Sequence, residues 1–319
     1  MRAAIYDRVT DDQIEEEVLF LLSWGFDLKP LKTSISRVGL VSPLVVKPHQ
    51  GRFRLICGHR RRQALRELGQ EEFFALILPD EYSLKQMLVL ALEENLGHRV
   101  FNDAEKALAL NHLASFFPSE ELIVHFLPRL GLPPRREFLE RFLGLVQLGS
   151  QGLTALAEGS LDPETGELLL ALDPVDRSAL LDLLDQFKPN RNKRRQIVTW
   201  LHEISQRDGR SVGEVLSDKA LQAVIEAENL SRPDKGKKAQ EIIHAWRYPE
   251  LSQAQEKQAR LTARLRLPAG IGLQTSPWFE GLAFSFNLSF INLDDLMNGL
   301  DHLSEIAASP EMAALLELG

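Results

Sequence analysis

Cysteine is almost absent from this sequence. Cys57 is the single cysteine among 319 residues, which excludes an internal disulfide framework and any zinc site built from several thiolates. Long apolar runs are missing too, since no stretch approaches the ~18 consecutive apolar residues that cross a bilayer. The first residues carry three aspartates and no apolar signal core. We therefore expect a cytoplasmic protein that makes no membrane contact.

The sequence also lacks an excess of positive charge. The net charge is −8, whereas proteins that coat nucleic-acid phosphates are usually basic. Dense cations occur only in the run at residues 188–195, so any DNA contact should be local. The length exceeds the ~250 residues at which single cores stop growing, so we expect several domains.

The first hundred residues have the pattern of a mixed α/β domain. Apolar residues recur at helical spacing or in short strand-like runs, and Gly39 is placed to end the first helix. The predicted elements are helices over residues 31–38, 60–68 and 83–96 and strands over residues 44–46, 53–57 and 73–78, with a hairpin turn at residues 49–51. Ser83 is placed as a helix N-cap, and Asn102 begins the next helix with Glu105 at the capping-box position.

The rest of the chain has a different pattern. Residues 101–215 predict helices only, residues 216–250 are polar and read as a linker, and residues 251–319 predict a helix end, two strands and a helix. The fold class expected is therefore α+β and multidomain, with a mixed domain over residues 1–100.

A glycine stands where a predicted strand meets a predicted helix. Gly58 lets the backbone approach a bound group closely, and the helix start offers free N–H groups and a positive dipole end. Arg60, Arg61 and Arg62 add donors suited to phosphate oxygens. The pattern predicts a phosphate site, and a solvated basic helix face is the open alternative.

A second polar cluster ends the last helix of this domain. Glu94, Asn95 and Arg99 lie within six residues and combine a carboxylate, an amide and a guanidinium, which suit Mg²⁺ and a nucleotide. A plain helix C-cap is the alternative, with Arg99 favoured by the helix dipole.

The order and spacing of these motifs resemble the N-terminal domain of the ParB family. The resemblance covers about residues 30–106, from the Ser-Ile…Gly-Leu…Pro stretch through both polar clusters to Asn102 and Glu105. It implies a ParB/sulfiredoxin-like α/β domain that binds CTP, with Mg²⁺ near Glu94 and Asn95. The nucleotide-binding residues implied are Gly39, Pro43, Gly58, His59, Arg60, Arg61, Glu94, Asn95 and Arg99.

Three features depart from the family pattern. His59 stands where many partition proteins have glutamate, three residues rather than two separate Asn95 from Arg99, and Trp24 begins a Trp-Gly-Phe-Asp stretch where a Gln-Pro-Arg is common. The catalytic residues are therefore unknown, and slow CTP hydrolysis as a switch is the one reaction that the resemblance suggests. Cys57 precedes Gly58, unlike the catalytic cysteine of sulfiredoxin-like enzymes, so we expect a buried strand residue.

The all-α region is similar to the helix-turn-helix domain of the same family. Arg135, Arg136 and Arg141 on the expected recognition helix could reach phosphates or guanine edges. Glu137 and Glu140 on that helix oppose phosphate binding, so a helical domain with weakened base reading stays open.

The cationic run supplies a second expected DNA contact. Lys193, Arg194 and Arg195 would neutralise backbone phosphates, and a solvated loop is the alternative interpretation.

The C-terminal segment looks like the small ββα dimerisation domain that ends many ParB proteins. Phe279, Phe284, Phe286 and Phe290 are too many aromatics for a lone hairpin to bury. A symmetric partner would cover them, so we expect a homodimer.

Three functions remain on the sequence alone. The first is a CTP-gated dimeric clamp on DNA in chromosome or plasmid partition, associated with the nucleoid or plasmid, with a partition ATPase as a further partner. The second is a ParB-like adaptor that works through protein partners. The third is a nucleotide-dependent kinase or nuclease of the same superfamily.

Overall fold

The computed structural model describes residues 4–15, 17–274 and 284–317. These residues divide into two compact units. The first unit contains residues 1–218 with residues 228–236, and the second contains residues 219–227 with residues 237–319. Within the described residues, no helix is long and apolar enough to span a membrane.

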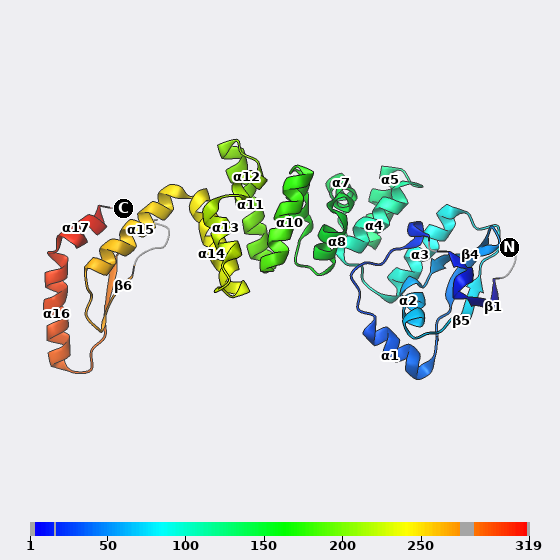
Figure 1. The fold of residues 1–319 in the computed structure, drawn as a ribbon, viewed down its shortest axis with the longest axis horizontal. Coiled ribbons are helices and arrows are strands. Elements are labelled where there is room, and N and C mark those ends of the chain that lie inside the picture. Colours follow the sequence, from blue (N-terminus) through cyan, green and yellow to red (C-terminus); the bar gives the residue numbers. More distant parts are fainter. Residues whose placement is uncertain (1–3, 16, 275–283, 318–319) are drawn as a thin grey trace. The chain divides into compact units, whose positions relative to one another are not determined.

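A mixed five-stranded sheet organises the first hundred residues (Figure 1). In sheet order its strands are β1 (Ile5–Thr10), β5 (Glu72–Ile77), β3 (Leu44–His49), β4 (Arg52–Cys57) and β2 (Ile14–Glu15). β3 and β4 form the predicted antiparallel hairpin through a turn at Gln50 and Gly51. β5 runs parallel to β3 and antiparallel to β1, and β2 runs parallel to β4.

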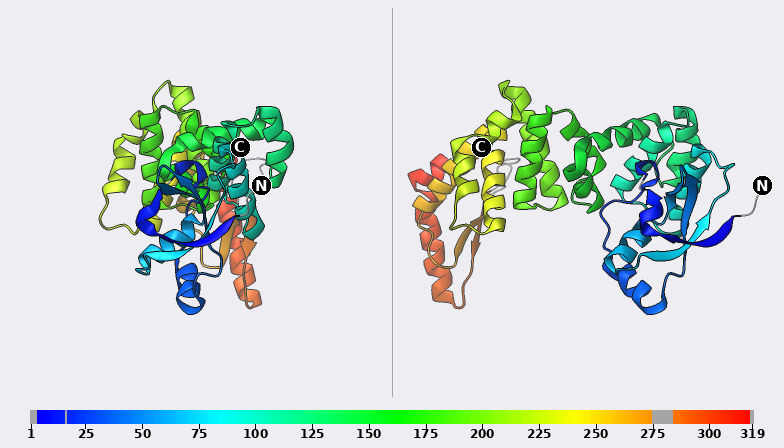
Figure 2. Two further views of the ribbon diagram at one scale, coloured as in Figure 1. Left: turned by 90° about the vertical axis from the view of Figure 1, so that its right-hand side faces the viewer. Right: turned by 45° about the vertical axis from the view of Figure 1, so that its right-hand side comes forward.

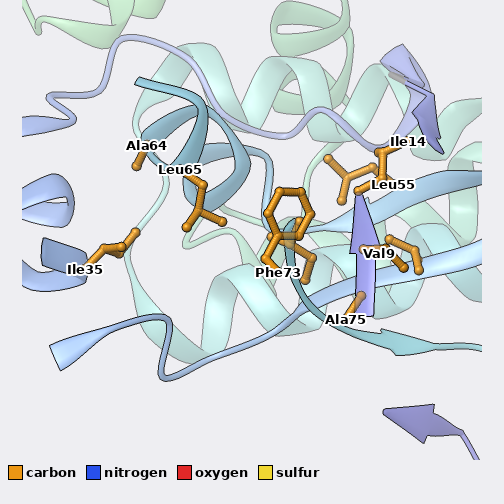
Figure 3. Packing of buried hydrophobic residues seen from close by; sticks show 10 residues of the cluster. Val9, Ile14, Ile35, Leu55, Ala64, Leu65, Phe73 and Ala75 are labelled. Atoms are coloured by element: carbon orange, nitrogen blue, oxygen red, sulfur yellow. The ribbon is translucent and has the colours of Figure 1, made fainter. Parts of the chain in front are cut away.

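Three helices cover this sheet. They are α1 (Lys29–Val38), α2 (His59–Glu67) and α3 (Leu84–His98). Figure 3 shows Ile35 of α1 and Ala64 and Leu65 of α2 directed toward strand residues such as Leu55 and Phe73. Because neighbouring strand residues point to opposite faces and Ile56 is as fully buried as Leu55, both faces of β4 are covered. α3 packs against this strand.

The predicted helix boundaries in this domain are confirmed where a local signal exists. α1 ends at Gly39, which has a φ of 77°. Ser83 caps α3, and Asn102 caps the next helix, α4 (Asp103–Ala114), through a capping box with Glu105. β1 was not predicted, because a strand with mostly exposed residues lacks the alternating pattern. β2 was not predicted, because two residues are too few to show a period.

Residues 103–216 are helical, as predicted (Figure 2). A π-helical turn, Leu122–Phe126, separates the two short helices α5 and α6. After α4 the helices are α5 (Ser119–Glu121), α6 (Leu127–Arg129), α7 (Arg136–Leu145), α8 (Gly149–Ala157), α9 (Pro163–Leu170), α10 (Pro174–Phe187), α11 (Arg191–Asp208) and α12 (Val212–Leu216). The recognition helix was expected over residues 134–148. It corresponds to α7, which begins two residues later, at Arg136.

The structure corrects the linker predicted at residues 216–250. This stretch forms α13 (Lys219–Glu226) and α14 (Arg232–Arg247). Pro233 is compatible with a helix because the first turn needs no N–H donor from it. The prediction of a linker rested on the polar composition of this stretch alone, and it is wrong.

The second unit contains the expected strand pair. It consists mainly of α15 (Pro249–Arg264), β6 (Ile271–Gln274), β7 (Ser285–Leu288), α16 (Leu293–Ala307) and α17 (Pro310–Leu316). β6 and β7 are antiparallel, and Asn292 caps α16. Phe279, named in the dimer argument, lies outside the described residues.

Candidate functional site

Gly58 forms the junction between β4 and α2. Its φ of 98° and ψ of 23° lie in the left-handed region, which L-residues with a side chain rarely adopt. A Cβ here would stand 2.6 Å from Leu44 Cδ2 and 3.3 Å from Arg61 Nε. Only glycine fits without displacing these neighbours, and the first N–H groups of α2 lack partners within the helix.

A cavity of about 370 Å³ opens at this junction. Leu28, Pro30 and Leu31 contribute an apolar wall, and Asp27 and Ser42 also line it. It brings together seven of the nine predicted nucleotide-binding residues: Gly58, His59, Arg60, Arg61, Glu94, Asn95 and Arg99. The other two do not line the cavity: Gly39 ends α1, and Pro43 contributes its carbonyl to Arg61.

Arg61 ties the two polar clusters together. Its Nη1 donates to the carbonyl oxygens of Ser42 and Pro43, at 3.1 and 2.7 Å. Its Nη2 makes an ion pair with Glu94. Residues 33 positions apart in sequence therefore share one wall of the cavity.

Arg60 is held at the cavity by three neighbours. Its Nη2 donates to Glu105 Oε1 at 2.6 Å, and its Nε donates to Ser23 Oγ at 3.2 Å. Its guanidinium lies over the Phe26 ring, 4.4 Å from the centroid. Among the described residues, its Nη1 has no hydrogen-bond acceptor, so this group is available to a ligand.

Arg99 has protein partners on all three of its nitrogens. Nε and Nη2 donate to Asn95 Oδ1 at 3.2 and 3.0 Å, and Nη2 also donates to the Leu22 carbonyl and Ser23 Oγ. Its Nη1 pairs with Glu105. Three residues, rather than the usual two, separate Asn95 from Arg99. With this spacing, Arg99 bonds to protein groups and stabilises the cavity wall.

Glu105 joins this arrangement although the sequence indicated it only as a capping residue. Its side chain is 1% exposed and accepts hydrogen bonds from Arg60, Arg99 and the backbone N–H groups of Trp24 and Asn102. The capping box was a usable signal for its position. Its guanidinium partners were not predictable, since Arg60 lies 45 residues away.

Burial controls the protonation of two neighbours of Gly58. Desolvation, followed by the charges of Arg62 and Arg61, lowers the pKa of His59 to about 4. Desolvation, with the charge of Glu94 adding to it, raises the pKa of Cys57 to about 12. His59 is therefore neutral at physiological pH, and Cys57 is the buried, protonated strand residue that was predicted.

A second cavity, of about 510 Å³, runs along α2. Arg62 in its lining is 6% exposed and donates to Asp11 Oδ1 at 2.6 Å and to the Ile14 carbonyl. Of the predicted ligand residues, His59 is the one that lines it. Arg62 therefore stabilises the fold through these bonds. We assign the ligand site to the smaller cavity, at the start of α2.

The residues present fit Mg²⁺ in part. Protein-bound Mg²⁺ commonly takes one or two carboxylates and completes its shell with water and substrate phosphates, so Glu94 is a suitable ligand. Asn95 is less suitable, because its Oδ1 already accepts from Arg99 and its Nδ2 donates to the Ala91 carbonyl. No group of three metal-binding side chains occurs among the described residues.

Comparison with known families gives residues 26–96 as a match to the ParB N-terminal domain. This match contains both polar clusters except Arg99, and it confirms the resemblance predicted from the motifs.

Two of the curated relatives of the chain are named as chromosome-partitioning proteins. The chain is 31% identical over 150 residues to the chromosome-partitioning protein Spo0J of Thermus thermophilus, covering 47% of this chain and 53% of that one. It is 28% identical over 173 residues to a probable chromosome-partitioning protein ParB of Campylobacter jejuni, covering 54% and 59%. The chain thus spans about half the length of the curated relatives it matches.

Solved structures of ParB proteins are also similar. The C-terminally truncated ParB of Caulobacter crescentus complexed with CTP-γ-S covers 56% of this chain and 98% of that chain, at 19% identity and a TM-score of 0.27.

The helices that follow the matched residues 26–96 pair most of the predicted DNA-binding arginines with carboxylates. Arg136 pairs with Glu120 at 3.5 Å and Glu140 at 3.9 Å. Arg141 is bonded to Glu167 at 2.7 Å, and its side chain is 18% exposed. Arg135 pairs with Glu137, and Arg195 pairs with Glu164, both at 3.7 Å.

Arg194 does not reach the surface, in contrast to the prediction from the cationic run. Its side chain is 3% exposed, with Asp185 at 3.9 Å. It shares the inner stripe of α11 with Ile197, Val198 and Leu201. Lys193 and Arg195 on the same turn are exposed.

Proposed function

We propose that the cavity at the start of α2 binds the phosphates of a nucleotide, with CTP as the ligand. The observation that carries this is the convergence of seven predicted residues on one cavity. A helix N-terminus with free N–H groups beside Arg60 is a site suited to phosphate. The match of residues 26–96 to the ParB N-terminal domain supports CTP as the specific ligand.

The charge of the cavity supports a role for Mg²⁺. Three arginines face it, and the carboxylates of Asp27, Glu94 and Glu105 balance them. A triphosphate brings several negative charges that this neutral set leaves uncompensated. A divalent cation held by Glu94 and the phosphates would supply the missing charge.

At the level of the whole protein, we propose a DNA-binding partition protein that acts as a homodimer. The relatives' names place them in chromosome partition. In this proposal CTP closes the N-terminal domains of a dimer around chromosomal or plasmid DNA, and slow hydrolysis reopens them. A partition ATPase would act as a further partner.

An exposed apolar surface on the second unit supports the homodimer. Its members lie on α16 and the segment before it: Phe290, Ile291, Leu293, Met297 and Leu300, each at least 49% exposed. Contiguous apolar surface of this kind usually marks an interaction site, and a symmetric copy would bury it on both chains.

A second candidate, the ParB-like adaptor, is favoured by the ion pairs of α7. Arg136 and Arg141 of this helix and Arg135 at its N-cap already have carboxylate partners, and DNA phosphates would have to replace these partners. A protein partner that carries both acidic and basic side chains could contact this helix while the arginine–carboxylate pairs stay intact.

The proposal is tested by calorimetric titration with CTP, ATP, GTP and UTP in Mg²⁺. Saturable binding of CTP, lost in Arg60→Ala, supports it. Preference for ATP would favour a nucleotide-dependent kinase of the superfamily, and absence of binding to all four would leave the adaptor. Titration of labelled DNA with and without CTP then separates the clamp from the adaptor.

A further inference from the structure

Glu105 is the most densely bonded carboxylate around the cavity. Oε1 accepts from Arg60 Nη2 at 2.6 Å and from the Trp24 backbone N–H at 3.2 Å. Oε2 accepts from Arg99 Nη1 and from the Asn102 N–H at 3.1 Å. Each oxygen therefore holds one guanidinium and one backbone donor, and the side chain is 1% exposed.

Helix capping alone does not require a carboxylate at this position. Gln86 occupies the equivalent place in the capping box of α3 and accepts from the Ser83 N–H at 3.0 Å. Glu214 fills the same place at α12, accepting from the Ser211 N–H at 2.8 Å, and makes no ion pair with an arginine among the described residues. The negative charge of Glu105 is therefore not needed for capping and must be explained by its other contacts.

The two guanidiniums need a shared acceptor to stay together. Burial, and then the charge of Arg99, lower the pKa of Arg60, and Glu105 acts in the opposite direction. Without a carboxylate, two half-buried like charges would repel each other. Glu105 lies behind them and does not line the cavity.

We propose that Glu105 is a positioning residue, which presets the guanidinium of Arg60 for phosphate binding, fixes Arg99 in the cavity wall and does not touch the ligand itself. This proposal rests on the proposed nucleotide site. It deepens that proposal by assigning the geometry of the phosphate donors to a residue on α4, outside the matched domain at residues 26–96.

Glu105→Gln separates position from charge. In either orientation the new amide places an NH₂ against one guanidinium and one backbone N–H, so one arginine loses its acceptor. We expect CTP affinity to fall at least about tenfold, because a hydrogen bond to a charged group is worth that much. If Glu105 acts only as a counter-charge, its removal strengthens anion binding, and the opposite sign would overturn the proposal.

Two further variants control for folding and for charge. Glu214→Gln removes the same capping carboxylate without an arginine and should keep wild-type affinity. Glu105→Asp keeps the charge but withdraws the carboxylate by one methylene, so it should also weaken CTP binding. Wild-type affinity in Glu105→Asp would contradict positioning, since charge alone would then suffice.

A ligand-free measurement distinguishes this proposal from the nucleotide site itself. In ¹⁵N-arginine spectra, the Nη protons of Arg60 and Arg99 should give separate signals, because the carboxylate restricts rotation, and these should collapse in Glu105→Gln but not in Glu214→Gln. Unchanged arginine signals in Glu105→Gln would refute positioning even if CTP binds. A different outcome is that the wild type binds no nucleotide while the arginine signals still collapse in Glu105→Gln. That result would refute the nucleotide site and the role of Glu105 in ligand binding, but it would establish that Glu105 restrains the two arginines.

Discussion

Replacing Gly58 by alanine tests the geometry of the proposed phosphate site. At φ 98° the alanine backbone is strained by roughly 1–2 kcal/mol. Its Cβ would also lie 2.6 Å from Leu44 Cδ2. Leu44 is fully buried, so its methyl group has no space to retreat and overpacking adds roughly 1–3 kcal/mol.

Gly69 provides a matched control for this substitution. Its φ is 71°, and a Cβ there would meet nothing within 4 Å. Gly69→Ala should therefore lose only the backbone term of roughly 1–2 kcal/mol, while Gly58→Ala loses about 2–5 kcal/mol in total.

Thermal unfolding and CTP titration of both variants give the readouts. Each kcal/mol corresponds to roughly 2–4 °C in Tm for a unit of this size. CTP affinity should fall at least about tenfold in Gly58→Ala, because the Cβ also approaches Arg61 Nε, and should be unchanged in Gly69→Ala. Equal behaviour of the two variants in both assays would refute the close-packed junction.

Further predictions concern the second cluster, pH and DNA. Asn95→Ala should abolish CTP binding while sedimentation still shows a dimer, because Asn95 orients Arg99; retained binding would remove it from the site. The pKa of His59 falls from 6.5 unfolded to about 4 folded, so its contribution is complete above pH 6.5 and about 3 kcal/mol is lost as pH falls through 4. A pH series of denaturant unfolding should show this loss reduced in His59→Gln. For DNA, Arg135→Ala with Arg136→Ala should lower the slope of log affinity against log salt by about 0.9 for each phosphate that is no longer neutralised; an unchanged slope would favour the adaptor.

The sequence predicted those parts of the fold that depend on neighbouring residues. Gly39 and Ser83 mark helix ends through short-range backbone and capping signals, and both are confirmed. The polar stretch 216–250 was misread because its helices have few buried residues to set a period. Arg194 was misread as surface, although the spacing of Ile197, Val198 and Leu201 indicated its buried side.

In the candidate site, too, features set by local motifs were predicted and contacts between distant segments were not. Gly58, Arg61 and Glu94 were predicted from motifs, and the cavity brings them together. The partners of Arg60 were not predictable, because Ser23 and Glu105 come from distant segments that only the tertiary fold places beside it.

The central claim is nucleotide binding at the start of α2, and calorimetric titration of the wild type and Arg60→Ala with CTP and Mg²⁺ tests it most directly. The account predicts one saturable site per chain in the wild type and its loss in the variant, since Arg60 Nη1 faces the ligand site with no acceptor among the described residues. Equal CTP binding by both proteins would contradict the assignment of the site, and no binding by either would contradict the claim itself.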